Sequence, residues 1–134
     1  MKEKIVKLIN EGDLLFKEES YLDAIDKYKE ANNYINDDTF DLYFADIQIS
    51  IGDSYFKLKD CDNALNHFFE ALKDSDVENS SFVMLRLGQC IGTNGDIDKA
   101  KFYFLKAYQI DGEDAFYGHE ELLPLIDDVL SEDK

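Results

Sequence analysis

One stretch of the sequence decides the fold, residues 51–71, which reads IGDSYFKLKDCDNALNHFFEA. After Gly52 come a bulky residue at +3, an alanine at +12, an aromatic residue at +16 and a second alanine at +19. The same offsets follow Gly12 and Gly88. The matched positions are Leu15, Ala24, Tyr28 and Ala31; Tyr55, Ala64, Phe68 and Ala71; and Ile91, Ala100, Phe104 and Ala107. Three copies in so short a chain indicate a repeated structural unit.

Each copy contains two stretches with the apolar spacing of an amphipathic helix. We expect helices over about 2–17, 21–34, 40–58, 62–73, 82–93 and 97–110. Residues that favour caps precede three of them, namely Ser20, Asp60 and either Ser80 or Ser81, and Asn94-Gly95-Asp96 is a strong turn signal. Since no segment keeps a strand period for long, the sequence predicts an all-α protein of three helix hairpins.

The repeated positions have a packing role. Alanines allow two helices to cross closely, and the aromatic residue at +16 fills the space between layers. Hairpins of this kind bury only part of their apolar surface alone, so stacking is expected to complete the core.

At this point the pattern resembles the tetratricopeptide repeat, a helix–turn–helix unit with leucine–glycine–x2–tyrosine followed by alanine–x3–phenylalanine–x2–alanine. Ile51-Gly52-Asp53-Ser54-Tyr55 begins the best copy, Leu87-Gly88 the next, and Glu11-Gly12 the weakest. The resemblance implies a single domain, a right-handed α-solenoid with repeats over about 5–36, 40–76 and 81–112.

The sequence departs from that family in three ways. The usual tryptophan slot holds Leu8, Gln48 and Met84, and the closing proline is absent. The glycines are 40 (52 − 12) and 36 (88 − 52) residues apart, against a family repeat of about 34. Longer helices or longer loops would both accommodate the extra residues, and we expect lengthened helix ends.

The tail contains no fourth copy, because Pro124 stands where the next glycine would fall. Glu120-Glu121 before Pro124 resembles a helix start, and an apolar face follows at Leu122, Leu123, Leu125, Ile126, Val129 and Leu130. We expect a C-terminal capping helix over about 114–132, since terminal repeats need a cover. Dimerisation or docking of a partner is the alternative use of this helix.

Composition narrows the classes of partner. The 134 residues carry 30 acids against 14 bases, a net charge of −16, which repels nucleic acid and anionic lipid. The sequence has no run long and apolar enough for a membrane span, and its start does not resemble a signal peptide, so we expect a cytoplasmic protein without membrane or nucleic acid contacts. Cys61 and Cys90 lack metal-ligand spacing and are expected to be free.

The sequence offers no arrangement of residues for catalysis. Its two histidines, His67 and His119, belong to no metal-binding spacing, and neither a phosphate-binding glycine loop nor a nucleophile motif is present. We therefore expect no cofactor, no metal and no enzymatic activity.

In this family the first helix of each hairpin lines the concave side. By that resemblance the groove residues are Val6, Ile9, Asp13, Phe16 and Lys17; Asp46, Ile49, Asp53, Phe56 and Lys57; and Phe82, Leu85 and Gln89. Members of this family that bind the C-terminal carboxylate of heat-shock chaperones use lysine and asparagine at the matching positions. Ile9, Asp13 and Asp53 stand there instead, so anion capture is not expected.

These observations predict a protein- or peptide-binding module whose acidic and apolar groove suits a partner with basic and apolar side chains. An adaptor, a chaperone and a masking partner would all fit this description. The alternative from another class is structural self-association, a homodimer formed through the exposed end of the repeats or the C-terminal helix.

Overall fold

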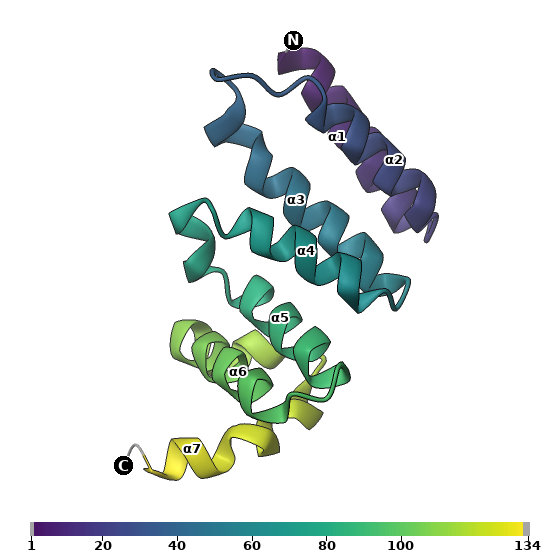
Figure 1. Ribbon diagram of the computed structural model, residues 1–134. Helices are drawn as coiled ribbons and strands as arrows, with labels where there is room; N and C mark the ends of the chain where they lie inside the picture. The colour runs from purple at the N-terminus through teal and green to yellow at the C-terminus, as the bar shows by residue number, and fades with distance from the viewer. Residues whose placement is uncertain (1, 133–134) are drawn as a thin grey trace. The chain divides into compact units, whose positions relative to one another are not determined.

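The structure, a computed structural model, describes residues 2–132 (Figure 1). Its α-helices are α1 (Lys2–Lys17), α2 (Tyr21–Asn32), α3 (Phe40–Lys57), α4 (Cys61–Ala71), α5 (Ser81–Thr93), α6 (Ile97–Asp111) and α7 (Asp127–Glu132). Three 3₁₀-helices accompany them, η1 (Ser75–Asn79), η2 (Gly112–Phe116) and η3 (Glu120–Ile126). No strand occurs among these residues, and the predicted all-α class and its six repeat helices are confirmed.

The chain divides into two compact units, one ending at Val77 and the other beginning at Glu78. In the first unit α1 packs on α2, α2 on α3, and α3 on α4. In the second unit α5 packs on α6, and η2 and η3 lie against this hairpin.

The repeated glycines mark close helix contacts inside each hairpin. A Cβ atom on Gly12 would lie 2.6 Å from the ring of Tyr28, and one on Gly88 would lie 2.5 Å from the ring of Phe104. The corresponding distance from Gly52 to Phe68 is 2.9 Å. Real Cβ atoms do not approach carbon so closely, so only glycine lets the aromatic side chain lie flat on the first helix.

The aromatic and alanine positions form the core that their spacing predicts. Phe68 is fully buried, and Tyr28 and Phe104 are each 2% exposed. The six alanines at +12 and +19 are 0–2% exposed: Ala24, Ala31, Ala64, Ala71, Ala100 and Ala107. Because so little space remains around them, a larger side chain at any of these alanines would overpack the helix crossing.

The three hairpin turns repeat one backbone conformation. Glu19, Lys59 and Gly95 have positive φ angles of 65°, 63° and 99°, and they are spaced by 40 (59 − 19) and 36 (95 − 59) residues, as the core glycines are. The next residue is the N-cap of the second helix of each hairpin. The side chains of Asp60 and Asp96 each accept a hydrogen bond from the backbone N–H three residues later, whereas the Ser20 side chain makes no such bond.

The two junctions between copies accommodate their extra residues differently. α3 begins 12 residues before Gly52 (52 − 40), whereas α5 begins 7 residues before Gly88 (88 − 81). The expected lengthening of a helix end is therefore confirmed at the first junction, where Asn36 also accepts hydrogen bonds from Asp38 and Thr39. At the second junction that expectation is wrong, because the extra residues form η1.

A buried polar pair lies inside the first unit at the slot where the family has tryptophan. Gln48 is 5% exposed, and its Oε1 lies 2.7 Å from Nδ1 of His67. An amide oxygen can only accept, so Nδ1 carries the proton. Burial lowers the pKa of His67, and the nearby Lys29 lowers it further, while Glu70 acts in the opposite direction.

Candidate functional site

The candidate site of the first unit is centred on the buried Tyr28 and the carboxylate that accepts its hydrogen bond. The hydroxyl of Tyr28 on α2 donates a hydrogen bond of 2.6 Å to Oδ1 of Asp13 on α1. Asp53 on α3 also acts electrostatically on the same phenol. Asp13 and Asp53 occupy equivalent positions, one residue after the core glycine of their repeats. Asp13 contacts the phenol directly, and Asp53 is its counterpart in the next repeat.

The burial of Tyr28 and its contact with Asp13 determine the protonation state of its hydroxyl. Burial raises its pKa, and the hydrogen bond and negative charge of Asp13 raise it further. Asp53 adds a smaller effect of the same sign, while a hydrogen bond with Ser50 lowers the pKa slightly. The phenol therefore stays neutral at physiological pH and remains a donor to the carboxylate.

Apolar residues flank the two acids on both helices. Ile9 and Phe16 of α1 are partly buried and pack against the core, and the Phe16 ring meets Tyr21 edge-on at 5.1 Å. The equivalent residues of α3, Ile49 and Phe56, are also partly exposed. A partner would therefore meet apolar rings and side chains beside the carboxylates.

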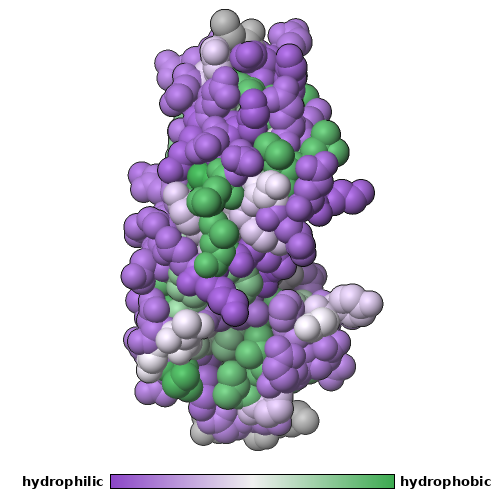
Figure 2. All heavy atoms as spheres, turned by 90° about the vertical axis from the view of Figure 1, so that its right-hand side faces the viewer, coloured by the Kyte–Doolittle hydropathy of each residue, from purple (hydrophilic) through white to green (hydrophobic). Residues whose placement is uncertain are grey.

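The outer residues of the predicted groove are more exposed. Lys17, Asp46 and Lys57 are exposed, and Val6 is 37% exposed. Val6 also lines a hollow on α1 that continues to Leu14, a residue outside the predicted groove. On the side that Figure 2 shows, hydrophilic residues cover most of the surface and the apolar residues lie in patches between them.

In the second unit the three remaining predicted residues lie beside the C-terminal segment. Phe82 and Leu85 line a hollow of about 310 Å³, together with Ser81, Arg86, Asp114, Ala115, Tyr117 and His119. Phe82 is 39% exposed, but Leu85 is only 3% exposed. A ligand would therefore reach Phe82 before Leu85.

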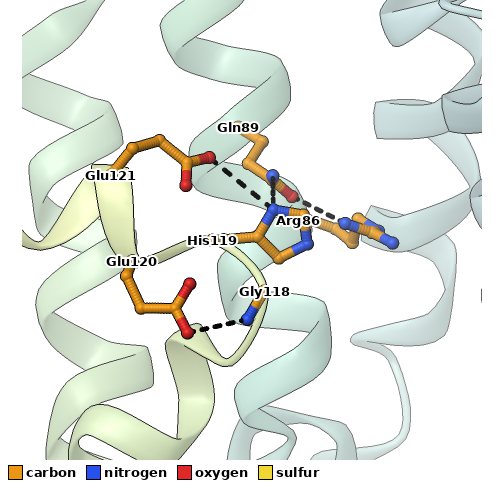
Figure 3. Close-up of polar contacts among 6 residues, drawn as sticks. All are labelled: Arg86, Gln89, Gly118, His119, Glu120 and Glu121. Carbon is orange, nitrogen blue, oxygen red and sulfur yellow. Dashed lines mark hydrogen bonds and ion pairs between the residues drawn. The ribbon is translucent and has the colours of Figure 1, made fainter.

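Gln89, the last predicted groove residue, belongs to a polar chain that crosses from α5 to the C-terminal segment (Figure 3). Arg86 donates a hydrogen bond of 2.8 Å to Oε1 of Gln89, whose Nε2 lies 3.4 Å from Nδ1 of His119. His119 Nδ1 is 3.9 Å from a carboxylate oxygen of Glu121. The guanidinium of Arg86 also lies over the Phe82 ring at 4.8 Å. Gln89 is thus engaged within its own unit.

Sequence reasoning missed the residue that fixes the tail. Phe116 is fully buried, and its ring centroid is 6.2 Å from that of Phe104, the aromatic core residue of the third copy. A large aromatic residue shortly after the helix-ending Gly112 is the signal that could have indicated it. The expected helix start at Glu120 is instead the 3₁₀-helix η3, which contains Pro124. Proline removes a backbone donor, and the α-helix begins only at Asp127.

The described residues contain no cluster of three or more histidine, cysteine or acidic side chains able to hold a metal ion. Within the same part of the chain, no helix combines the length and apolar character that crossing a membrane requires.

Comparison with protein families identifies one segment of the chain. Residues 83–114, which contain the core glycine, alanine and aromatic positions of the third copy, match the family model described as tetratricopeptide repeat. This segment is similar to a tetratricopeptide repeat. The predicted resemblance is therefore confirmed at the third hairpin, and the first two hairpins share its spacing and glycine–aromatic contact. Among curated proteins, no sequence matches the chain.

Tetratricopeptide repeats generally mediate interactions between proteins, and they are typically non-enzymatic. The predicted class of function agrees with this general role.

Proposed function

We propose that the first unit binds a protein segment carrying basic and apolar side chains, on the face formed by α1 and α3. The observation that carries the proposal is the Tyr28–Asp13 hydrogen bond. Asp53 occupies the equivalent position in the next repeat and also raises the pKa of the same phenol. Two acids near each other attract a lysine or arginine more strongly than either alone.

The surroundings of the acids favour a mixed partner over a purely basic one. Phe16 and Phe56 flank the carboxylates and are partly exposed, so apolar side chains of the partner would bury area there. Lys17 and Lys57, one residue farther along each helix, are exposed and would disfavour an unbroken basic run at that end. The net charge of −16 would speed the approach of a positively charged segment.

The test uses defined peptides instead of an unknown ligand. A library of short peptides that combine lysine or arginine with leucine or phenylalanine is compared with the same peptides carrying glutamate in place of each basic residue. Fluorescence anisotropy at about 0.15 M salt, where exposed charges more than ~8 Å apart are screened, is expected to detect binding within the basic set only.

The decisive variant is Asp13→Asn with Asp53→Asn. Asparagine keeps an oxygen that accepts from Tyr28, so the fold is expected to survive while two negative charges are lost. Loss of both charge pairs is expected to raise the Kd at least about tenfold, equivalent to about 1.4 kcal/mol.

The matched control is Asp23→Asn with Asp26→Asn, which removes the same charge from exposed positions of α2. Basic peptides are expected to bind this control as they bind the unaltered chain. Equal losses in both double variants would reduce the effect to net charge and contradict the proposed site. Equal binding of the basic and glutamate libraries would contradict the proposed partner.

A further inference from the structure

A second surface lies along the outward face of α1. Lys2, Glu3, Val6, Lys7, Asn10, Glu11 and Leu14 line a hollow of about 690 Å³ there. Leu14 is 63% exposed and Val6 is 37% exposed. Within the described chain, no other element contributes to the lining of this hollow. Val6 and Leu14 thus place two aliphatic side chains on one open helix face, where a partner would bury apolar area.

The residues of this face are arranged symmetrically about Asn10. Val6 and Leu14 each lie four residues from it, and Glu3 and Lys17 each lie seven residues from it. These five residues are spaced by three or four, so they share one side of the helix. With a rise of about 1.5 Å per residue, the aliphatic pair stands about 6 Å from Asn10 and the charged pair about 10.5 Å from it.

We infer that this face binds a second copy of the chain, with two α1 helices antiparallel about a two-fold axis at Asn10. In that arrangement Val6 of each copy meets Leu14 of the other, and Glu3 of each copy faces Lys17 of the other. One side of a helix thereby becomes complementary to itself, as a two-fold interface requires.

Charge is the reason for choosing a second copy as the occupant. Two copies that each carry −16 repel one another over most of their surfaces. On this face the antiparallel arrangement instead sets a negative residue against a positive one at both ends. Lys2 and Lys7, which also line the hollow, lower the local excess of acid. Asn10 would face its own symmetry mate, and paired asparagines in helix interfaces specify register.

The contact is small, which limits its strength. One face of a 16-residue helix offers less than the roughly 800 Å² per partner of a standard interface. The dimer is accordingly weak and concentration-dependent, with a Kd between about 50 μM and 1 mM.

This inference does not rest on the proposed binding site, although the two surfaces are neighbours. Val6 and Lys17 belong to both sets, whereas Leu14 belongs only to the dimer face and Asp53 only to the proposed site. Substitutions at Leu14 and Asp53 therefore separate the failure of one proposal from the failure of the other.

Sedimentation equilibrium of the whole chain, from about 10 μM to about 1 mM, tests the inference. The unaltered chain is expected to move from monomer to dimer across this range. Leu14→Lys is expected to weaken the dimer at least tenfold, because two lysines would enter the apolar contact. The matched control is Leu22→Lys on α2, where the leucine is 66% exposed and does not line the hollow on α1. That control is expected to dimerise like the unaltered chain.

Charge reversal tests the antiparallel register itself. Glu3→Lys and Lys17→Glu are each expected to weaken the dimer, since each places like charges together twice. The double variant restores opposite charges and is expected to return the Kd to within about threefold of the unaltered value. Circular dichroism verifies that every variant is folded.

Four results would overturn the inference. A monomer throughout the concentration range would show that no second copy binds. A dimer insensitive to Leu14→Lys would place the interface elsewhere. Equal weakening by Leu14→Lys and Leu22→Lys would exclude a specific face. A double variant no tighter than either single reversal would exclude the antiparallel register.

Discussion

The first and third hairpins share a packing plan and differ in what is added to it. Both place a glycine under an aromatic ring, but Tyr28 in the first carries a hydroxyl that reaches Asp13, whereas Phe104 in the third is covered by Phe116. The hydroxyl of Tyr28 connects the core of the first hairpin to a carboxylate, whereas the Phe116 ring covers the aromatic residue in the core of the third. The aromatic position looks interchangeable in the repeat pattern, but its side chain has different neighbours in the two hairpins.

The largest loss of stability is expected from a substitution in the core of the third hairpin. Phe104→Ala should destabilise it by about 3–5 kcal/mol, because the ring is 2% exposed and contacts both the Gly88 backbone region and Phe116. Amide hydrogen exchange of α5 and α6 would measure the loss within this unit. Phe102→Ala on the same helix is the control: its ring is 54% exposed, and a change below about 1 kcal/mol is expected. Equal losses would contradict the assigned core.

A smaller effect is expected at the first hairpin, where Tyr28→Phe removes only the hydroxyl. Loss of the hydrogen bond to a carboxylate should cost about 1–2 kcal/mol near neutral pH. Because the folded protein raises the pKa of Tyr28, its contribution to stability is present below the unfolded tyrosine value of about 10 and is lost as the pH rises above that value.

Denaturant unfolding between about pH 8 and pH 11 would detect this dependence. The unaltered chain should lose more stability across that range than Tyr28→Phe does. Tyr117→Phe serves as the control, since the Tyr117 side chain is 87% exposed. Parallel pH profiles for Tyr28→Phe and the unaltered chain would contradict a role of the folded structure in holding this proton.

The smallest expected effect concerns the turns. Lys59 holds a positive φ of 63°, a conformation that disfavours residues with a Cβ, so Lys59→Gly should stabilise the first unit by up to about 1 kcal/mol. Gly95 has a φ of 99°, and a Cβ there would meet no atom within 4 Å. Gly95→Ala should therefore destabilise the second unit by about 1 kcal/mol through backbone strain alone. Thermal unfolding would register both shifts, and shifts of the same sign would refute the explanation.

The sequence predicts the core of each hairpin well because that core depends on residue size. A glycine, two alanines and an aromatic residue can recur at these offsets only where two helices cross closely, and α1 begins and ends where its pattern predicts. The junctions were harder to predict. Extra residues can extend a helix, as at Phe40, or form a separate turn, as in η1, and residue size does not decide between these.

The candidate site was predictable only in part. Equal spacing placed Asp13 and Asp53 at equivalent positions. The same spacing predicted that the Tyr28 ring is buried, but it did not predict the hydrogen bond of the Tyr28 hydroxyl. The tail follows no repeat, so the burial of Phe116 and the contact of His119 with Gln89 depend on a chain path that periodicity does not describe.

Arg86 offers a way to measure the unfolding of the third hairpin by proteolysis. It is the sole arginine of the sequence, and it lies 5% exposed within α5. An arginine-specific protease must bind an extended strand around its target, so it can cut only after this helix has opened. The rate of that single cleavage measures how often the third hairpin unfolds, without any label or substitution, and a ligand that stabilises the hairpin would slow it in proportion.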